Sequence, residues 1–174
     1  MQAVGDLFLV GLKERQSFAD LVEGQVVFEF PEPGDVFFEA RELAFGGDLV
    51  GDLIERNQAA HACNGVEFRK LDLVNDALPA ADVILCRDCL VHLSFDDAQS
   101  ALANVARSGA KWLLTTSFPG IKRNDNIVTG QWRPINLTLP PFNFPEPKNV
   151  CAENCTETEF ADKTLALWPV EQIA

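Results

Sequence analysis

The sequence is poor in basic residues. It contains 14 Lys and Arg against 26 Asp and Glu, which gives a formal net charge of -12. A protein of this charge repels phosphate backbones and anionic lipid surfaces. We therefore expect neither nucleic acid nor a membrane surface as a partner.

The sequence also lacks long apolar runs and a recognisable export signal. The first residues form a short apolar patch without the basic region and cleavage site of a signal peptide, and no apolar run approaches the length of a bilayer span. The 5 cysteines are an odd number, and a hydrophobic content of 47% is sufficient for a core without disulfides. These features predict a cytoplasmic protein with reduced thiols.

The 174 residues are enough for one substantial core and too few for two ordinary domains, so we expect a single domain over 1–174. Short apolar runs alternate with segments of helical period, which is typical of βαβ units. The helix over 94–108 has the clearest signals, with Ser94 as its N-cap and Gly109 beyond its end. Strands are expected at 25–30, 43–48, 66–71, 82–86 and 111–118, with an N-terminal helical segment within 1–24 (a helix at 17–23) and a second helix in which Val50, Leu53, Ile54 and Ala60 share one face.

The composition changes after Pro119. Five of the ten prolines lie between Pro134 and Pro147, and a proline neither donates to a sheet nor fits inside a helix. We therefore expect 120–147 to form a long loop or lid. Two short strands near 148–151 and 164–168 are expected to pair as an antiparallel edge, through which two copies could form a homodimer.

Several stretches together resemble a known family. They are 44–50 (AFGGDLV), 66–72 (VEFRKLD), 82–94 (DVILCRDCLVHLS), 129–136 (TGQWRPIN) and 162–168 (DKTLALW). Their order and spacing resemble the class I S-adenosylmethionine (SAM)-dependent methyltransferases. The resemblance implies an α/β fold with a doubly wound, Rossmann-like, mostly parallel sheet, helices on both faces, and SAM as cofactor at the carboxyl ends of the first strands.

The resemblance also implies roles for single residues. Asp48 would accept hydrogen bonds from the ribose hydroxyls, and Asp72 would receive the adenine amino group. Cys86 and Arg87 would lie beside the cofactor, and Asp88 beside the substrate. Each acid has a local alternative, because Asp is common at strand ends as a cap of the next turn.

His92 is a further catalytic candidate. An imidazole titrates near neutral pH and could take a proton from a nucleophilic substrate. The alternative is a packed residue that bridges the turn and the following helix. For Arg87 and Asp88 the alternative is an ordinary surface charge.

The first strand departs from the family pattern. Family members place an acid there, followed by a glycine-rich turn that lets bare backbone approach the cofactor. If Glu29 aligns with the acid, Pro31 and Pro33 occupy positions where glycines belong. If instead Gly34 aligns with the end of the turn, Phe30 stands in place of the acid. Proline supplies neither the free N–H nor the positive φ of such a turn.

Two further groups of residues allow more than one interpretation. In the long loop, Trp132, Arg133 and Asn136 are candidates for substrate contacts, or Trp132 is only an anchor of the loop. The pairs Cys86-x-x-Cys89 and Cys151-x-x-x-Cys155 suggest zinc or redox chemistry, but the first pair spans a strand end and need not converge, so we expect no metal.

Two functions of different classes follow from the sequence. The first is SAM-dependent methyl transfer to an unidentified small-molecule or other soluble acceptor, mainly through alignment of the acceptor with the methyl group. The second is a degenerate scaffold that no longer catalyses and acts as a binding or interaction module. A zinc-stabilised module is a third possibility.

Overall fold

The computed structural model describes residues 8–10, 44–61, 66–153, 155 and 158–173. The strands are β1 (Phe8–Val10), β2 (Ala44–Asp48), β3 (Val66–Lys70), β4 (Val83–Cys86), β5 (Trp112–Ser117), β6 (Asn149–Ala152) and β7 (Thr164–Pro169). The helices are α1 (Gly51–His61) and α2 (Phe95–Arg107), with short 3-10 turns η2 (Leu90–His92), η3 (Thr158–Phe160) and η4 (Val170–Gln172). The predicted helix at 17–23, the predicted strand at 25–30, and Glu29 and Gly34 lie outside the described residues.

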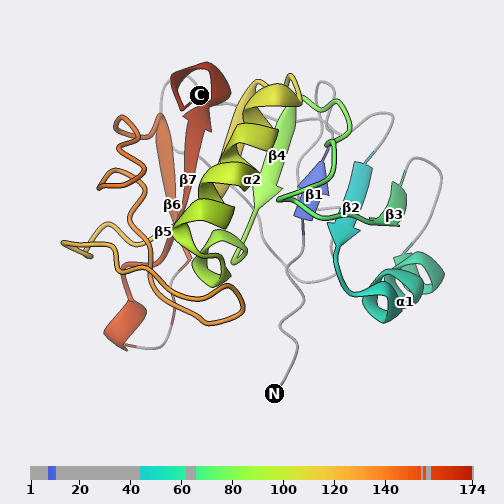
Figure 1. The fold of residues 1–174 in the computed structure, drawn as a ribbon, viewed down its shortest axis with the longest axis horizontal. Helices are drawn as coiled ribbons and strands as arrows, with labels where there is room; N and C mark the ends of the chain where they lie inside the picture. Colours follow the sequence, from blue (N-terminus) through green and yellow to red (C-terminus); the bar gives the residue numbers. More distant parts are fainter. Residues whose placement is uncertain (1–7, 11–43, 62–65, 154, 156–157, 174) are drawn as a thin grey trace.

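The seven strands form one sheet in the order β3-β2-β1-β4-β5-β7-β6 (Figure 1). The pairs β2–β3 and β4–β5 are parallel, whereas β1 is antiparallel to both β2 and β4, and β7 is antiparallel to both β5 and β6. The α/β class is confirmed. The expected mostly parallel sheet needs correction, because the pairing is mixed even though β2, β3, β4, β5 and β6 all run in one direction.

The mixed pairing on this side of the sheet is due to β1, a strand that was not predicted from the sequence. The strand contains only three residues, Phe8, Leu9 and Val10, and lies between β2 and β4. A run this short has no period that distinguishes a strand from any other apolar patch. Its antiparallel direction follows from pairing and cannot be read from its composition.

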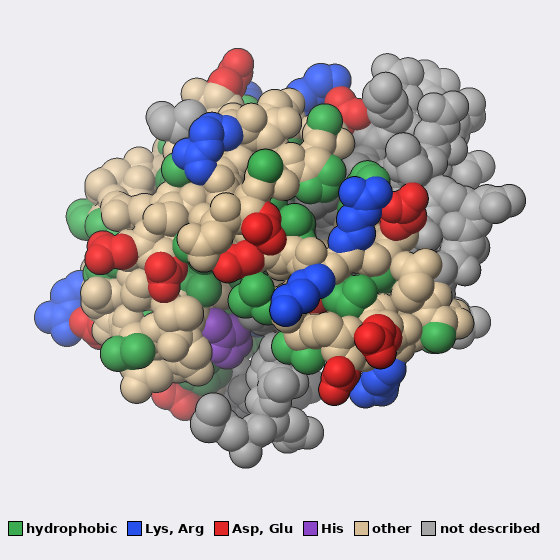
Figure 2. All heavy atoms as spheres, turned by 45° about the vertical axis from the view of Figure 1, so that its right-hand side comes forward, with side chains coloured by type: hydrophobic (Ala, Val, Ile, Leu, Met, Phe, Trp, Pro, Cys, Tyr) green, Lys and Arg blue, Asp and Glu red, His purple; other side chains and the backbone are tan. Residues whose placement is uncertain are grey.

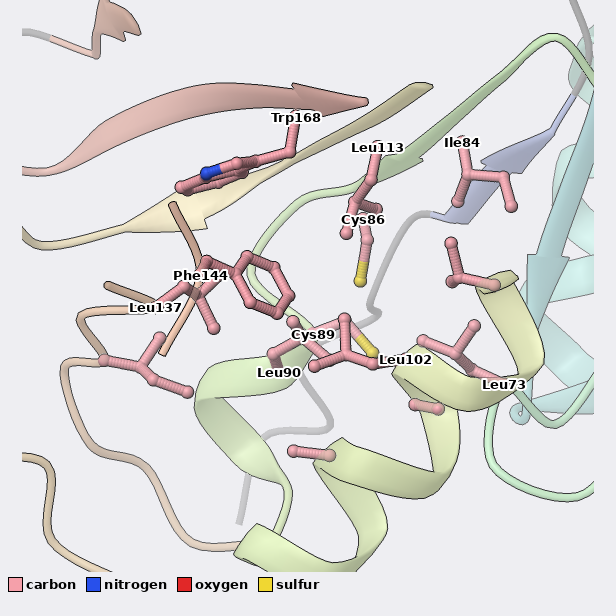
Figure 3. Packing of buried hydrophobic residues seen from close by; sticks show 14 of the residues in the cluster. Leu73, Ile84, Cys86, Cys89, Leu90, Leu102, Leu113, Leu137, Phe144 and Trp168 are labelled. Atoms are coloured by element: carbon pink, nitrogen blue, oxygen red, sulfur yellow. The ribbon is translucent and has the colours of Figure 1, made fainter. Parts of the chain in front are cut away.

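One face of the central strands carries the main core. Ile84, Cys86 and Leu113 pack with Leu102 of α2 and with Trp168 of β7 (Figure 3), and all five are at most 6% exposed. The run VILC in β4 is buried at every position, as the sequence predicted for a strand covered on both faces. The opposite face carries a second buried cluster formed by Leu85, Leu114, Leu165 and Leu167.

Helix α2 lies in front of β4 in Figure 1 and has the ends that its sequence predicts. The Ser94 hydroxyl accepts a hydrogen bond from Asp97 N at 3.2 Å, and Gly109 has a φ of 80° just beyond the end of the helix. Inside the helix, the Asn104 side chain donates to the carbonyls of Leu73 and Val74, at 2.9 and 2.8 Å. The helix is therefore tied both to the sheet and to the turn after β3.

Strand β3 and helix α1 are more exposed than the central strands. In α1, Leu53 and Ile54 are half-buried, but Val50 and Ala60 are exposed, so the predicted apolar face is narrower than expected. Gly46 is required in β2, because a Cβ at this position would lie 2.4 Å from the ring of Phe68 in β3.

Residues 120–147 contain neither helix nor strand, as predicted, and run as a long loop on the left of Figure 1. The predicted antiparallel pair at the C-terminal edge is also confirmed by β6 and β7. None of the helices within the described ranges combines the length and apolar character needed to cross a bilayer.

We predict that Leu113→Ala lowers the free energy of unfolding by about 3 kcal/mol, because truncation of a fully buried leucine leaves a cavity. Urea unfolding measures the change. Val128→Ala is the control, since Val128 is 72% exposed and its truncation should cost less than about 0.5 kcal/mol. Equal losses in the two variants would contradict the described core.

Candidate functional site

Ends of several strands meet at one edge of the sheet, which we call the carboxyl edge. Strands β2, β4 and β5 run in one direction and end at Asp48, Cys86 and Ser117. Strand β7 runs the opposite way and therefore begins at this edge, where Thr164 donates its hydroxyl hydrogen to Ser117 O at 2.9 Å. Open α/β sheets bind ligands outside the carboxyl ends of their strands.

Asp48 is a buried acid, and only one of its two carboxylate oxygens accepts a hydrogen bond within the described residues. It is 8% exposed, and its Oδ1 accepts a hydrogen bond from Val50 N at 2.6 Å. Its Oδ2 is buried and has no hydrogen-bond partner in the described part of the chain. A buried oxygen without a partner costs free energy unless a ligand or water satisfies it.

Asp72 is used differently. Its Oδ1 accepts from Val74 N and its Oδ2 from the Asn75 side chain, both at 2.8 Å, while Asp76 accepts from Asp72 N at 2.8 Å. Both oxygens therefore hold the turn after β3, which matches the local alternative considered for this residue. A contact with adenine remains a prediction.

The side chain of Cys86 points into the buried cluster, and its contact with a cofactor stays a prediction. Cys86 and Cys89 are 1% and 7% exposed, and both sulfur atoms lie among the buried residues of Figure 3. The Cys86 carbonyl accepts from the Thr115 hydroxyl at 2.7 Å, so this oxygen is already hydrogen-bonded to a side chain of the neighbouring strand β5. Within the described ranges, no three His, Cys, Asp or Glu side chains gather as metal ligands.

Four charged side chains form a network at the carboxyl edge. Arg87 donates through Nε to Glu153 Oε1 at 2.5 Å, and Lys163 donates through Nζ to Asp88 Oδ2 at 2.7 Å. Lys163 Nζ also lies 3.3 Å from Glu153 Oε2, too poorly oriented for a hydrogen bond but close enough for an ion pair. The network contains two cations and two anions, and is thus formally neutral.

Burial and pairing act in opposite directions on Arg87. Burial alone would lower the pKa of its guanidinium, but the hydrogen bond from Arg87 to Glu153 and the charges of Glu153 and Asp88 outweigh it and raise the pKa. Arg87 stays charged throughout the physiological range.

Figure 2 shows Lys and Arg side chains interspersed with Asp and Glu over one face of the molecule, so charges of both signs meet there.

The backbone of Asp88 has an unusual conformation. Its φ is 55°, in the left-handed region, and its N–H donates to the Thr116 hydroxyl at 2.8 Å. Such a backbone persists only where the surroundings hold it, and it is common at functional sites. Thr116 on β5 and Lys163 before β7 together hold Asp88 at the end of β4.

His92 contacts the long loop. Its Nδ1 lies 3.0 Å from Gln131 O, and its backbone carbonyl accepts from Gly130 N at 2.8 Å. The ring is half-buried, and its hydrogen-bond partner among the described residues is Gln131 O and not Asp88. His92 thus connects the turn after β4 to the long loop, whereas the alternative considered from the sequence was a bridge to the following helix. A role of His92 as a base stays a prediction.

Arg133 fixes the loop to the turn that follows β4. It is 5% exposed, and its guanidinium donates to the carbonyls of Leu90, Leu93 and Asp125 at 2.8, 2.9 and 3.1 Å. Burial lowers the pKa of this guanidinium. The structure thus gives Arg133 a structural role, and the substrate contact that the sequence suggested stays a prediction.

Asn136 has a similar task. Its N–H donates to Asn124 Oδ1 at 2.8 Å, the Asn124 side chain donates to Asn136 O at 2.8 Å, and both side chains are buried. The Asn136 amide also donates to the carbonyls of Pro119 and Ile121. This pair of asparagines closes the loop upon itself.

Trp132 is the candidate of the loop that remains accessible. It is 44% exposed, and its ring packs edge-to-face against Phe160 at 4.8 Å and Phe118 at 6.2 Å between centroids. Phe118 directly follows β5, so these three rings, which we call the aromatic cluster, lie at the carboxyl edge.

Sequence reasoning missed Glu153, Lys163 and Phe160. Glu153 follows β6, and Lys163 precedes β7. The topology contains the signal that was overlooked, because an antiparallel strand that begins at the carboxyl edge brings its first residues there. Phe160 had no signal of its own, since it lies in a single 3-10 turn.

No protein-family model matches the chain, and no curated protein matches it either. Solved structures do match it. Human N-acetylserotonin methyltransferase in complex with SAM has a TM-score of 0.50 at 12% identity, over 72% of this chain and 39% of that one. The chain has the class I methyltransferase fold.

Two further methyltransferases are similar at lower scores. Magnesium protoporphyrin IX methyltransferase from Synechocystis PCC 6803, solved with bound SAH, has a TM-score of 0.36 and 23% identity over 45% of this chain and 37% of that one. An O-methyltransferase family protein from Burkholderia thailandensis has a TM-score of 0.43 and 19% identity over 68% of this chain and 40% of that one. The chain spans about two fifths of the length of the solved methyltransferases it matches.

We predict that Arg133→Met destabilises the protein by about 2 kcal/mol, because it removes the side-chain donor of the buried Leu93 carbonyl and leaves Leu90 O with only the 3.3 Å hydrogen bond from Leu93 N. It should also speed trypsin cleavage after Lys122 and Arg123, which are exposed in the loop that Arg133 holds. Arg69→Met is the control, since Arg69 makes a surface pair with Glu67 that contributes less than about 1 kcal/mol. Urea unfolding and timed digestion give the two readouts; equal behaviour of the variants would refute the structural task of Arg133.

We predict that Lys163→Met lowers the free energy of unfolding by about 3 kcal/mol, because it leaves the mostly buried Glu153 carboxylate with one cation fewer. The double variant Lys163→Met/Glu153→Gln should lose less unfolding free energy than the sum of the two single variants, since Glu153→Gln removes the carboxylate charge that Lys163→Met leaves under-compensated. A double-mutant cycle by urea unfolding measures this coupling. Strict additivity would mean that the network is not coupled.

Proposed function

We propose that this chain binds SAM at the carboxyl edge and transfers its methyl group to a small-molecule or other soluble acceptor. The observation that carries the proposal is the unpartnered Oδ2 of Asp48 at the end of β2. The fold supports it as an analogy, because the matched human methyltransferase is in complex with SAM. This chain spans only about two fifths of the length of the matched methyltransferases, so the complete methyl-transfer activity is itself part of the proposal.

Asp48 fits a ribose diol. Its Oδ1 is held by Val50 N, which fixes the side-chain rotamer, and its Oδ2 is left to accept from a hydroxyl. A carboxylate suits such a ligand because it offers acceptors and no competing donor. The exposed apolar side chains of Leu49 and Val50 follow directly and would border the same ligand.

When bound, SAM would supply an electrophilic methyl group: the sulfur keeps the electrons of the broken S–C bond, a lone pair of the acceptor forms the new bond to the methyl carbon, and the acceptor's proton passes to water. The chain's own contribution is alignment. Arg87 and Asp88 stand at the end of β4 in a network that holds both side chains, and Thr116 fixes the Asp88 backbone. These groups would orient the acceptor without carrying a net charge.

The doubly wound layout is part of the proposal. The units β2–α1–β3 and β4–α2–β5 lie on either side of β1 and progress in opposite directions along the sheet. Right-handed crossovers would then place α1 and α2 on opposite faces, with the ligand at the point where the direction reverses. The free thiols of the described cysteines support our placement of the protein in the cytoplasm.

Titration calorimetry with S-adenosylhomocysteine (SAH), the expected product, tests the proposal without knowledge of the acceptor. We predict saturable binding by the wild type and at least tenfold weaker binding, or about 1.4 kcal/mol, by Asp48→Asn. When its single oxygen stays on Val50 N, the asparagine places an NH2 donor where the free carboxylate oxygen lies, so this position can no longer accept from a hydroxyl. Asp82→Asn is the control, because Asp82 precedes β4 at the opposite edge and pairs with Lys111 on the surface.

Three outcomes are informative. Loss of affinity in Asp48→Asn alone supports the assignment of Asp48. Equal affinity in the wild type and Asp48→Asn, with both folded, refutes that assignment. No heat from a folded wild type at high SAH concentration refutes cofactor binding and leaves the degenerate scaffold, for which Pro31 and Pro33 are the sequence signal.

A further inference from the structure

The aromatic cluster presents an exposed ring on a rigid support. Trp132 keeps 44% of its surface exposed although it packs against Phe160 and Phe118. Phe118 itself is 1% exposed, and Phe118 and Phe160 are 6.0 Å apart in edge-to-face packing. A large accessible aromatic side chain with a buried aromatic base is typical of a ligand contact.

The residues on both sides of Trp132 are held in place. Before it, Gln131 N donates to Val128 O at 3.0 Å, and the Gln131 side chain accepts from Val128 N. After it, Arg133 N donates to Val91 O at 3.0 Å, in addition to the bonds of the buried guanidinium. The indole is therefore presented by an ordered loop, so binding there would cost little conformational entropy.

The cluster lies on the far side of β4 from Asp48. Strands β1, β4 and β5 follow β2 in the sheet, and neighbouring strands are separated by about 4.8 Å, so the ends of β2 and β5 are about 14 Å apart. A ligand held at Asp48 that extends along the carboxyl edge reaches β4 before it reaches Phe118. The aromatic cluster is thus placed for a second molecule and not for the ribose.

The charges near the cluster do not select an ion. Asp88 and Glu153 are paired with Lys163 and Arg87, and Asp162 accepts from Gly120 N at 2.7 Å. Among the described residues of the turn, Glu159 is a further acid, and it is exposed, where water and salt screen its charge. An uncharged ring suits these surroundings better than a cation.

We propose that Trp132 and Phe160 bind an uncharged planar aromatic compound, and that the methyl acceptor belongs to this class. The second statement rests on the proposed methyl transfer, whereas the first does not. The Arg87–Glu153–Lys163–Asp88 network adjoins the site, since Lys163 N donates to Phe160 O at 3.0 Å, and the network contributes no net charge to it.

The test uses 2-naphthol as a probe, with decahydro-2-naphthol as a probe of the same skeleton without aromaticity, and 2-naphthylmethylammonium as a cationic one. Titration calorimetry is performed on the wild type, Trp132→Leu, Phe160→Leu and the loop control Val128→Ala. We expect saturable binding of 2-naphthol, at least tenfold weaker in Trp132→Leu and Phe160→Leu and unchanged in Val128→Ala. The saturated and cationic probes should bind at least tenfold more weakly than 2-naphthol.

Absence of saturable 2-naphthol binding, or equal binding by Trp132→Leu with an unchanged unfolding midpoint, overturns the site. Equal or tighter binding of the saturated or the cationic probe overturns the ligand class. SAH is titrated into the same preparations, so failure of cofactor binding is recognised separately from failure of the aromatic site.

Discussion

The arrangement of the carboxyl edge depends on how the carbonyls at the end of the turn after β4 are satisfied. Within η2, Leu90 O accepts only a long hydrogen bond of 3.3 Å from Leu93 N, and a buried carbonyl without a good donor is costly. Arg133 supplies the donors from a loop forty residues away. This contact fixes the loop as well as the turn, and both the exposure of Trp132 and the position of His92 follow from it.

The antiparallel edge of the sheet brings the charged network together. Glu153 follows β6 and Lys163 precedes β7, and both meet Arg87 and Asp88 because β7 begins at the edge where β4 ends. Desolvation penalises each ion, so the charges are tolerated as a neutral set. The result is a polar rim of fixed shape beside an aromatic surface, which suits discrimination by shape and alignment more than by charge.

Sequence reasoning succeeded where local signals agree and failed where the partner is distant. The α2 helix was predictable because Ser94, Gly109 and the apolar period all act within the helix, and β4 because VILC is apolar throughout. Asp48 was found through a resemblance, and no local rule indicates that one of its oxygens lacks a partner. The tasks of Arg133 and Asn136 could not be predicted, because both act on carbonyls, and a carbonyl has no residue-type signature.

The three-residue strand β1 joins two unequal parts of the sheet. On one side β4, β5 and β7 bury nearly every side chain, while on the other β3 and α1 remain largely exposed beyond the mostly buried β2. Local unfolding free energies follow buried contacts, so the β2–β3 part opens more readily than the rest. Asp48 belongs to this less stable part and Trp132 to the stable one. A molecule that spanned both would act as a clasp across the sheet and raise the cooperativity of the whole domain.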